Sequence, residues 1–155
     1  MNQTRIREVE DALLGLLKAA LPDVKNIAAL TEGDVNEEDQ LIAEPPAIRL
    51  FFGAESFDRA RDHMALTYQS GQSWTALCGA QNRRGVEDER ADALELLGRV
   101  LDALAGARLA GLASQTQGPQ VVLKRVGLLQ MGPDGTWYLV EFAVESIVQF
   151  TGNGA

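Results

Sequence analysis

The sequence predicts an α+β protein in which a mostly antiparallel sheet packs against two main helices. Three observations predict it: apolar residues recur at helical spacing in two segments, they alternate in several others, and turn residues join neighbouring extended segments. The expected order of elements is α-β-β-β-α-β-β, which favours helices packed on a sheet. Since neither an internal repeat nor a linker is evident, we expect a single domain over residues 1–155.

The first helix is expected over Thr4–Leu21, where apolar residues form one stripe with the helical period. The stripe consists of Ile6, Val9, Leu13, Leu16, Leu17, Ala20 and Leu21. Thr4 is a candidate N-cap, and Pro22 marks the end of the helix. The short apolar segment Val24–Leu30 that follows is a candidate strand.

An acidic loop and a buried strand are expected next. The segment Thr31–Gln40 is acidic and poor in apolar residues, which is typical of a solvated or mobile loop. Pro45 and Pro46 stiffen the chain before the apolar segment Ala47–Phe52. We expect this segment to be a buried strand that ends at Gly53.

A β-hairpin and a second helix are expected in the middle of the chain. The extended segments His63–Gln69 and Trp74–Gln81 flank the polar residues 70–73, which predicts a hairpin with its turn there. The helix is expected over Asp88–Ala105, with Asp88 as its N-cap and Gly106 just after its end. Its expected buried stripe is Leu94, Leu97, Leu101 and Leu104.

The last strand, Thr136–Phe150, is the longest element expected. It follows the extended segment Val121–Gln130 and the turn Met131–Gly135, which contains Pro-Asp-Gly. One face carries Tyr138, Val140, Phe142, Val144, Val148 and Phe150, interrupted by Ser146. The other face carries Trp137, Leu139, Glu141, Ala143, Glu145, Ile147 and Gln149. Because ordinary strands have ~3–10 residues, we expect either a bulge that bends it or a part that reaches beyond its own core to a neighbouring subunit.

Composition limits the classes of function. Asp and Glu number 22 against 14 Lys and Arg, a formal net charge of −8, which argues against a primary role in gripping nucleic acid. The single cysteine, Cys78, excludes an intrachain disulfide and fits a reducing compartment. No apolar run approaches the ~20 residues that span a bilayer, and acidic residues stand where a signal peptide needs its apolar core. We expect a cytosolic type of protein without a membrane segment.

Candidates for covalent or metal chemistry are few. Cys78 and His63 are the available thiol and imidazole, but Cys78 lies on an apolar strand face, where cysteine acts as a small hydrophobic residue. One histidine and one cysteine do not complete a zinc site. The acidic segment Thr31–Gln40 lacks the ligand spacing of an EF-hand. We therefore expect neither a metal nor a cofactor.

Two further polar pairs were considered as sites. Glu141 and Glu145 share one strand face, which is compatible with acid–base chemistry, but they fit a surface or an interface better. Arg83 and Arg84 beside Gly85 are either solvated loop residues or a contact for phosphate or an acidic partner. No catalytic residue is predicted, and we expect a protein that is not an enzyme.

Several segments carry a resemblance to a known family. They are IREVEDALLGLLKAALPDVKNI, PPAIRLFFG, AQNRRG followed by ALELLGRVLDALAG, and YLVEFAVES. In this order, from Ile6 to about Ser146, the chain resembles the tail terminators of Mu-like and related long-tailed phages, a family long catalogued as a domain of unknown function. The resemblance implies an α+β virion protein, assembled in the host cytoplasm, that sits at the head-tail junction.

The resemblance also implies partners. A tail terminator forms a homo-oligomeric ring, typically of six subunits, on the last ring of the tail-tube protein. It stops tube polymerisation and presents a surface to the head-side connector protein, while DNA passes through without specific binding. We expect the outer face of the last strand to join subunits, through Trp137, Leu139, Glu141, Ala143, Glu145 and Ile147. The alternative is that the chain's own helices cover both sheet faces.

An acidic bore would avoid holding DNA phosphates. We therefore expect acidic residues of the Thr31–Gln40 segment at the bore or its rim, namely Glu32, Asp34, Glu37, Glu38 and Asp39. Arg83 and Arg84 are expected to contact a partner. An alternative function is a cytosolic binding or adaptor module that recognises an acidic or peptide ligand through these arginines and an exposed sheet edge. A small enzyme that uses Cys78 or the acid pair is a third.

Overall fold

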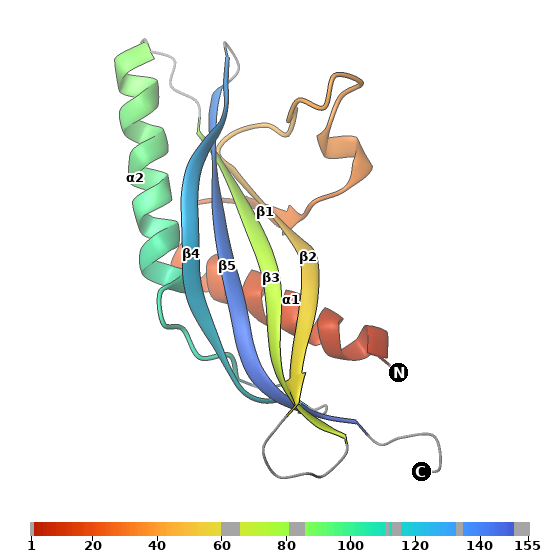
Figure 1. Cartoon of the computed structure of the whole chain (residues 1–155). Helices are drawn as coiled ribbons and strands as arrows, with labels where there is room; N and C mark the ends of the chain where they lie inside the picture. Colours follow the sequence, from red (N-terminus) through yellow and green to blue (C-terminus); the bar gives the residue numbers. More distant parts are fainter. Residues whose placement is uncertain are drawn as a thin grey trace.

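The computed structural model describes residues 2–59, 66–80, 86–110, 112, 116–132 and 135–150, with the side chains of 2–4, 59 and 86–91 left out (Figure 1). The predicted α+β class and the order α-β-β-β-α-β-β are confirmed. The elements are α1 (Asn2–Ala20), β1 (Asn26–Ala29), the 3₁₀ turn η1 (Glu32–Asp34), β2 (Ala47–Arg59), β3 (Thr67–Ala80), α2 (Val86–Leu104), β4 (Thr116–Gly132) and β5 (Gly135–Gln149).

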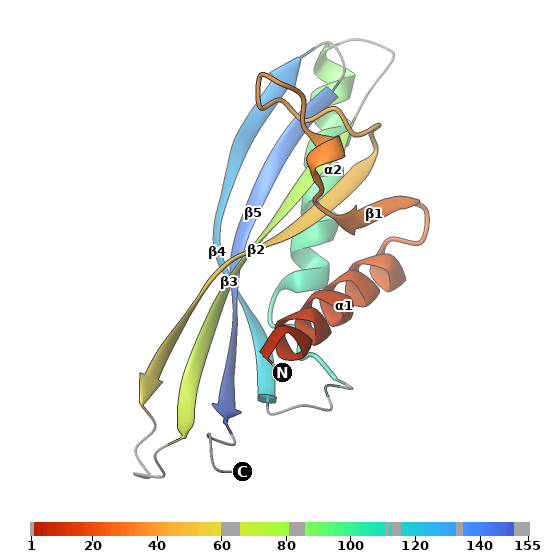
Figure 2. The same cartoon turned by 90° about the vertical axis from the view of Figure 1, so that its right-hand side faces the viewer.

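The strands form one five-stranded sheet in the order β1-β2-β3-β5-β4. The β1–β2 pair is parallel, and the other pairs are antiparallel. Both helices lie on the same side of the sheet (Figure 2), which we call the helix face. The opposite side is called the outer face. The end of the sheet near Gly132 and Gly135 is called the hairpin end, and the end near Thr67 and Gln149 the far end.

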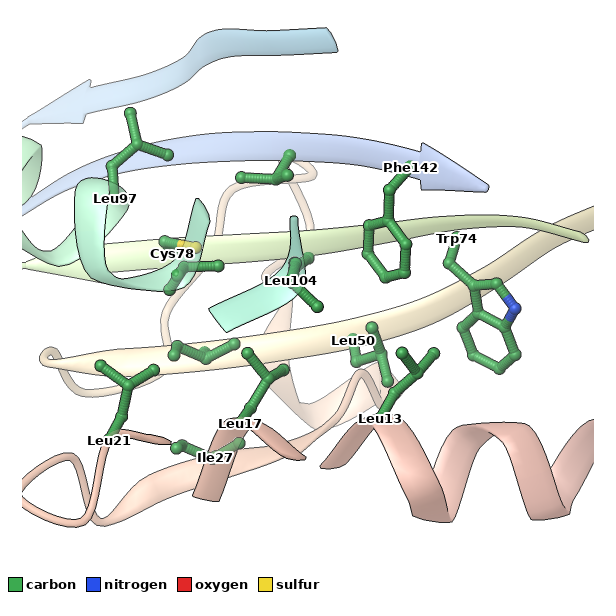
Figure 3. Packing of buried hydrophobic residues seen from close by; sticks show 14 of the residues in the cluster. Leu13, Leu17, Leu21, Ile27, Leu50, Trp74, Cys78, Leu97, Leu104 and Phe142 are labelled. Atoms are coloured by element: carbon green, nitrogen blue, oxygen red, sulfur yellow. The ribbon is translucent and has the colours of Figure 1, made fainter. Parts of the chain in front are cut away.

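The main core lies between the helix face and the two helices (Figure 3). Helix α1 contributes Val9, Leu13 and Leu17, whose spacing of four keeps them on one face, and Leu21 follows directly after the helix. From the strands come Ile48, Leu50, Trp74, Ala76, Cys78, Val140, Phe142, Val144 and Val148. Burying each large apolar side chain contributes about 1.5–3 kcal/mol, so this layer is the main source of stability.

Both predicted N-caps are wrong, because each helix starts earlier than expected. Helix α1 begins at Asn2, which places Thr4 inside it, and α2 begins at Val86, which places Asp88 in its first turn. The predicted end of α2 is confirmed: Ala105 N donates to Leu101 O at 2.9 Å, and Gly106 has a φ of +68°. Glycine adopts this left-handed conformation without steric cost.

The buried stripe of α2 differs from the predicted leucine stripe. Leu94 is 44% exposed and Leu101 is only partly buried, whereas Leu97 and Leu104 are buried as predicted. The remaining buried positions are Ala93, Leu96 and Val100. Steps of four, three and four residues through Ala93, Leu97, Val100 and Leu104 fit the helical period better than the leucine spacing does. The buried stripe therefore includes Ala93 and Val100, which are smaller than the leucines on which the prediction was based.

The predicted hairpin around residues 70–73 is wrong. These residues lie in the middle of β3, which pairs with β2 on one side and β5 on the other. Ser70 and Gln72 are buried in step with Trp74, since they donate hydrogen bonds to Glu55 and are therefore satisfied inside the sheet. Gly53 does not end β2 either: the strand continues to Arg59 past a register shift. His63 and Gln81 lie outside the described residues.

The long last strand is confirmed and is unbroken. Its register with β3 runs without a shift from Thr136–Ala80 to Gln149–Thr67. The bulges lie instead in β4, whose pairing with β5 shifts at three places. The far ends of β2, β3 and β5 extend past the helices (Figure 2). The length of β5 is therefore accommodated by a twisted sheet that is longer than its helical cover.

Candidate assembly surfaces

The outer face is covered at the hairpin end by the chain itself. The segment Leu30–Pro46, here called the crossing loop, packs on this face and builds a second apolar cluster. The cluster contains Leu41, Ala47, Leu77 and Trp137, with Leu30, Val35, Ala43, Phe51 and Leu139 partly buried around them. Trp137 is only 2% exposed. The first part of the expected subunit interface, Trp137 and Leu139, therefore belongs to the chain's own core.

Arg49 on β2 forms an ion pair with the crossing loop. This buried β2 side chain places its Nε 3.1 Å from Asp34 Oδ1, and its Nη2 donates to Asn26 Oδ1 at 2.7 Å. Asp34 also accepts a hydrogen bond from Thr31 N at 2.8 Å. Burial acts to raise the pKa of Asp34, but the hydrogen bonds from Thr31 and Arg49 outweigh it, and the pKa is lowered. Asp34 thus anchors the loop.

The tip of the crossing loop is an ordered turn. Asn36 Oδ1 accepts hydrogen bonds from Glu38 N and Gln40 N, both at 2.9 Å, which is an Asx-type arrangement. Leu41 N and O both bond the side-chain amide of Gln130 on β4, at 2.8 and 3.1 Å. The solvated part of the loop prediction holds for four carboxylates, which are exposed near the hairpin end: Glu32, Glu37, Glu38 and Asp39.

The outer face is open toward the far end. A hollow of about 560 Å³ lies there, lined by small and polar residues together with Asp58, Glu145 and Ile147. Of the expected interface residues, Glu145 and Ile147 are exposed and Ala143 is buried. Glu141 Oε2 accepts a hydrogen bond from Arg125 Nε at 2.9 Å. The open part of the expected interface is therefore smaller, more polar and more acidic than the sequence suggested.

Among the described residues, the largest group of exposed apolar side chains lies along β4, an edge strand of the sheet. Its exposed large apolar side chains are Leu123, Val126, Leu128, Leu129 and Met131. The sequence predicts this strand, but its position at the edge of the sheet was not predicted. The sequence does carry an indication of the edge, because the pairs Lys124-Arg125 and Leu128-Leu129 interrupt the alternation of polar and apolar residues. Charged residues and bulges are typical of edge strands.

Part of this edge is already paired. Leu109 N donates to Pro119 O at 3.0 Å, and Val121 N donates to Ala107 O at 2.8 Å. From Val122 to Met131, no described segment pairs with the outer side of β4. This stretch, here called the β4 edge, presents unpaired backbone groups beside apolar side chains. Such a surface is typical of a site that receives another chain.

A buried polar cluster joins α1 to the far half of the sheet. Arg5 donates to both oxygens of Glu55, at 2.6 and 2.5 Å, and Ser70 and Gln72 donate to the same carboxylate. Trp74 Nε1 in turn donates to Gln72 Oε1 at 2.8 Å. Because Arg5 and Glu55 are almost fully buried, this cluster fixes the helix on the sheet and does not act as a surface site.

Among the candidates for chemistry, the structure describes Cys78 and the pair Glu141 and Glu145. Cys78 is buried, and burial raises the pKa of its thiol to about 12, so the nucleophilic thiolate does not form at neutral pH. Within the described ranges, no three His, Cys, Asp or Glu residues are grouped to hold a metal ion. His63, Arg83 and Arg84 lie outside those ranges. None of the described helices is both long and apolar enough to cross a membrane.

The fold and these surfaces define a class of α+β protein in which helices cover one face of a sheet and a sheet edge stays open and apolar. In the part of the chain that the structure describes, no catalytic centre is assembled. A family model for Bacteriophage Mu, Gp37 matches residues 5–145. The chain belongs to this family, which agrees with the resemblance drawn from its sequence.

A solved structure is similar in fold. It is a chain from the virion of a native gene transfer agent (GTA) particle, with a TM-score of 0.50, 16% sequence identity and coverage of 84% of each chain. At this identity the likeness concerns the fold alone. No curated protein sequence matches the chain.

Proposed function

We propose that the protein is a structural component of a phage virion that terminates the tail tube as a closed ring. The observation that carries the proposal is the match of the Bacteriophage Mu Gp37 family over residues 5–145. The likeness in fold to a chain of a gene transfer agent virion is compatible with it. In this role the protein binds the last ring of tube subunits on one side and the head-side connector on the other, and it performs no catalysis.

The charge distribution supports a passage for DNA through the ring. The net charge is −8, and the exposed carboxylates of Glu32, Glu37, Glu38 and Asp39 lie near the hairpin end of the sheet. Carboxylates repel phosphates and therefore do not hold DNA as it passes. We propose that these four residues face the bore or its rim. Asp34 is left out, because its carboxylate is engaged by Arg49.

The open part of the outer face is proposed as a contact between subunits. Glu145 and Ile147 line the hollow at the far end, and Glu141 lies on the same face nearer the hairpin end. Trp137 and Leu139 pack against the crossing loop, which covers the neighbouring part of this face.

Growth of tail tubes in solution tests the function. Purified tube protein from the phage that encodes this chain is allowed to polymerise, and the chain is added at substoichiometric amounts. We expect extension to stop and the protein to be found at one end of each tube by electron microscopy. An unrelated acidic protein of similar size is the control. Continued growth, or protein bound along the sides of the tubes, would contradict the proposal.

A further inference from the structure

The sheet has a second unpaired edge, on the side opposite to β4 (Figure 1). Strand β1 pairs only with Ala47–Leu50 of β2, and Leu30 N adds one hydrogen bond to Leu50 O. Beyond that point no described segment pairs with the outer side of β2. The stretch Ala54–Asp58 is here called the β2 edge. It exposes Phe57, which is 43% accessible, and Asp58.

The side chains of the two edges match face by face. Val126 and Leu128 of the β4 edge lie opposite Val140 and Tyr138, which places them on the helix face. Phe57 of the β2 edge lies opposite Ser70, so it is on the helix face as well. If the two edges joined in one continuous sheet, their exposed apolar side chains would meet on the same side. Removal of this apolar surface from water would favour the contact.

The charges match on the other side of the sheet. Arg125 lies opposite Glu141 and Asp58 opposite Gln69, so both project from the outer face. Arg125 and its neighbour Lys124 are exposed, and Asp58 is exposed. Glu141 already pairs with Arg125, so Lys124 and Arg125 together leave a net positive charge beside Asp58. This favours the pairing and disfavours contact of either edge with itself.

The directions of β2 and β4 are also compatible with pairing of these two edges. Strands β2 and β3, β3 and β5, and β5 and β4 are antiparallel pairs, so β4 runs antiparallel to β2. A second copy placed beside the first in the same orientation would therefore extend the sheet by an antiparallel pair. The bulges interrupt the register of the β4 edge, and Arg125–Leu128 is its longest regular stretch. The backbone pairing would be short, so side-chain packing has to supply most of its specificity.

We propose that the β4 edge of one copy binds the β2 edge of a second copy, so that the sheets of neighbouring subunits become continuous. The inference rests on the proposed ring function, because a closed ring needs two different surfaces that fit each other. It adds the opposite margins of one sheet to the outer-face contact proposed above. The β2 edge lies nearer the far end than the β4 edge does, so neighbouring subunits would be displaced along the strand direction, as in a closed sheet with tilted strands.

Exposed lysine substitutions test the contact without disturbing the core. In the full chain we expect Val126→Lys or Leu128→Lys to raise the concentration needed for half-maximal assembly at least about tenfold, as for a residue at the centre of an interface. Ile42→Lys is the matched control, since Ile42 is also an exposed apolar residue but lies on the crossing loop. Sedimentation velocity measures assembly, and thermal unfolding verifies that each variant is folded.

Cross-linking between copies tests the pairing itself. An Arg125→Cys preparation is mixed with a Ser56→Cys preparation and treated with a short bis-maleimide, while Cys78 stays buried. We expect covalent dimers in this mixture, and none when Ile42→Cys replaces Arg125→Cys. Wild-type assembly that resists the β4 lysine variants, or equal cross-linking in both mixtures, would overturn the inference and leave the ring function standing. A wild type that assembles neither in solution nor on tail tubes would refute both.

Discussion

At the scale of single residues, Gly79 determines how the second apolar cluster is built. Gly79 of β3 lies opposite Trp137 of β5 on the outer face, and a Cβ at Gly79 would collide with the indole ring. Trp137 is buried because its ring rests on bare backbone. The sequence showed Trp137 on the mixed face of the strand, but nothing near it in the sequence identified Gly79 as its partner.

Replacement of Gly79 by alanine should therefore destabilise the protein. We expect Gly79→Ala to lower the free energy of unfolding by about 1–3 kcal/mol, the usual cost of overpacking. Gly98→Ala is the control: no atom lies within 4 Å of a Cβ there, and alanine in a helix interior is favoured over glycine by about 0.5–1 kcal/mol. Urea denaturation should give opposite signs for the two variants. Equal effects would contradict the packing of Trp137 on Gly79.

The pKa of Glu55 leads us to expect that the protein loses stability in acid. Burial acts to raise the pKa of Glu55, but hydrogen bonds from Arg5, Ser70 and Gln72 outweigh it and lower the pKa below the usual 4.5. Because the pKa is lowered in the folded state, the stabilisation is fully present above pH ~4.5 and is lost as the pH falls through the folded value.

The comparison with Glu55→Gln measures this effect. At neutral pH the variant should be less stable by about 3–5 kcal/mol, because it leaves Arg5 buried without its partner. Below pH 4.5 the free energy of unfolding of the wild type should approach that of the variant. A constant difference across the acid range would show that Glu55 is not the titrating group.

At the scale of elements, period-two alternation predicted β5 correctly, because one face is almost entirely apolar and the other carries Glu141, Glu145 and Gln149. The same rule failed at β3, where Ser70–Ser73 look like a turn but are paired on both sides. The side chains of Ser70 and Gln72 donate hydrogen bonds to Glu55, which is fifteen residues from Ser70 along the chain. Local pattern cannot reveal such distant hydrogen-bond partners. For the same reason it could not show which strand would form the exposed edge.

The crossing loop depends on a partner from another element as well. Gln130→Ala should remove both hydrogen bonds to Leu41 and leave its partly buried backbone groups unpaired, at a cost of about 1–3 kcal/mol. Hydrogen exchange at the Leu41 amide should then become faster, whereas Gln117→Ala, at an exposed position of the same strand, should leave it unchanged. Unchanged exchange in Gln130→Ala would mean that apolar packing alone holds the loop.

At the scale of the whole molecule, one sheet serves two purposes. Its helix face supplies the core, and its outer face is divided between a part covered by the crossing loop and an open, acidic part. The sequence predicted the core and the class of protein, since these follow from residue patterns and from the family resemblance. It did not predict the two open margins of the sheet, because strand order depends on long-range pairing.

The central proposal is that a ring of this protein terminates tail tubes. The most direct measurement grows tubes from tube protein of one fluorescent colour, adds the chain, and then supplies tube protein of a second colour. The predicted result is that ends carrying the chain gain no second-colour segment, while ends without it continue to grow. Second-colour segments beyond ends that carry the protein would contradict the account.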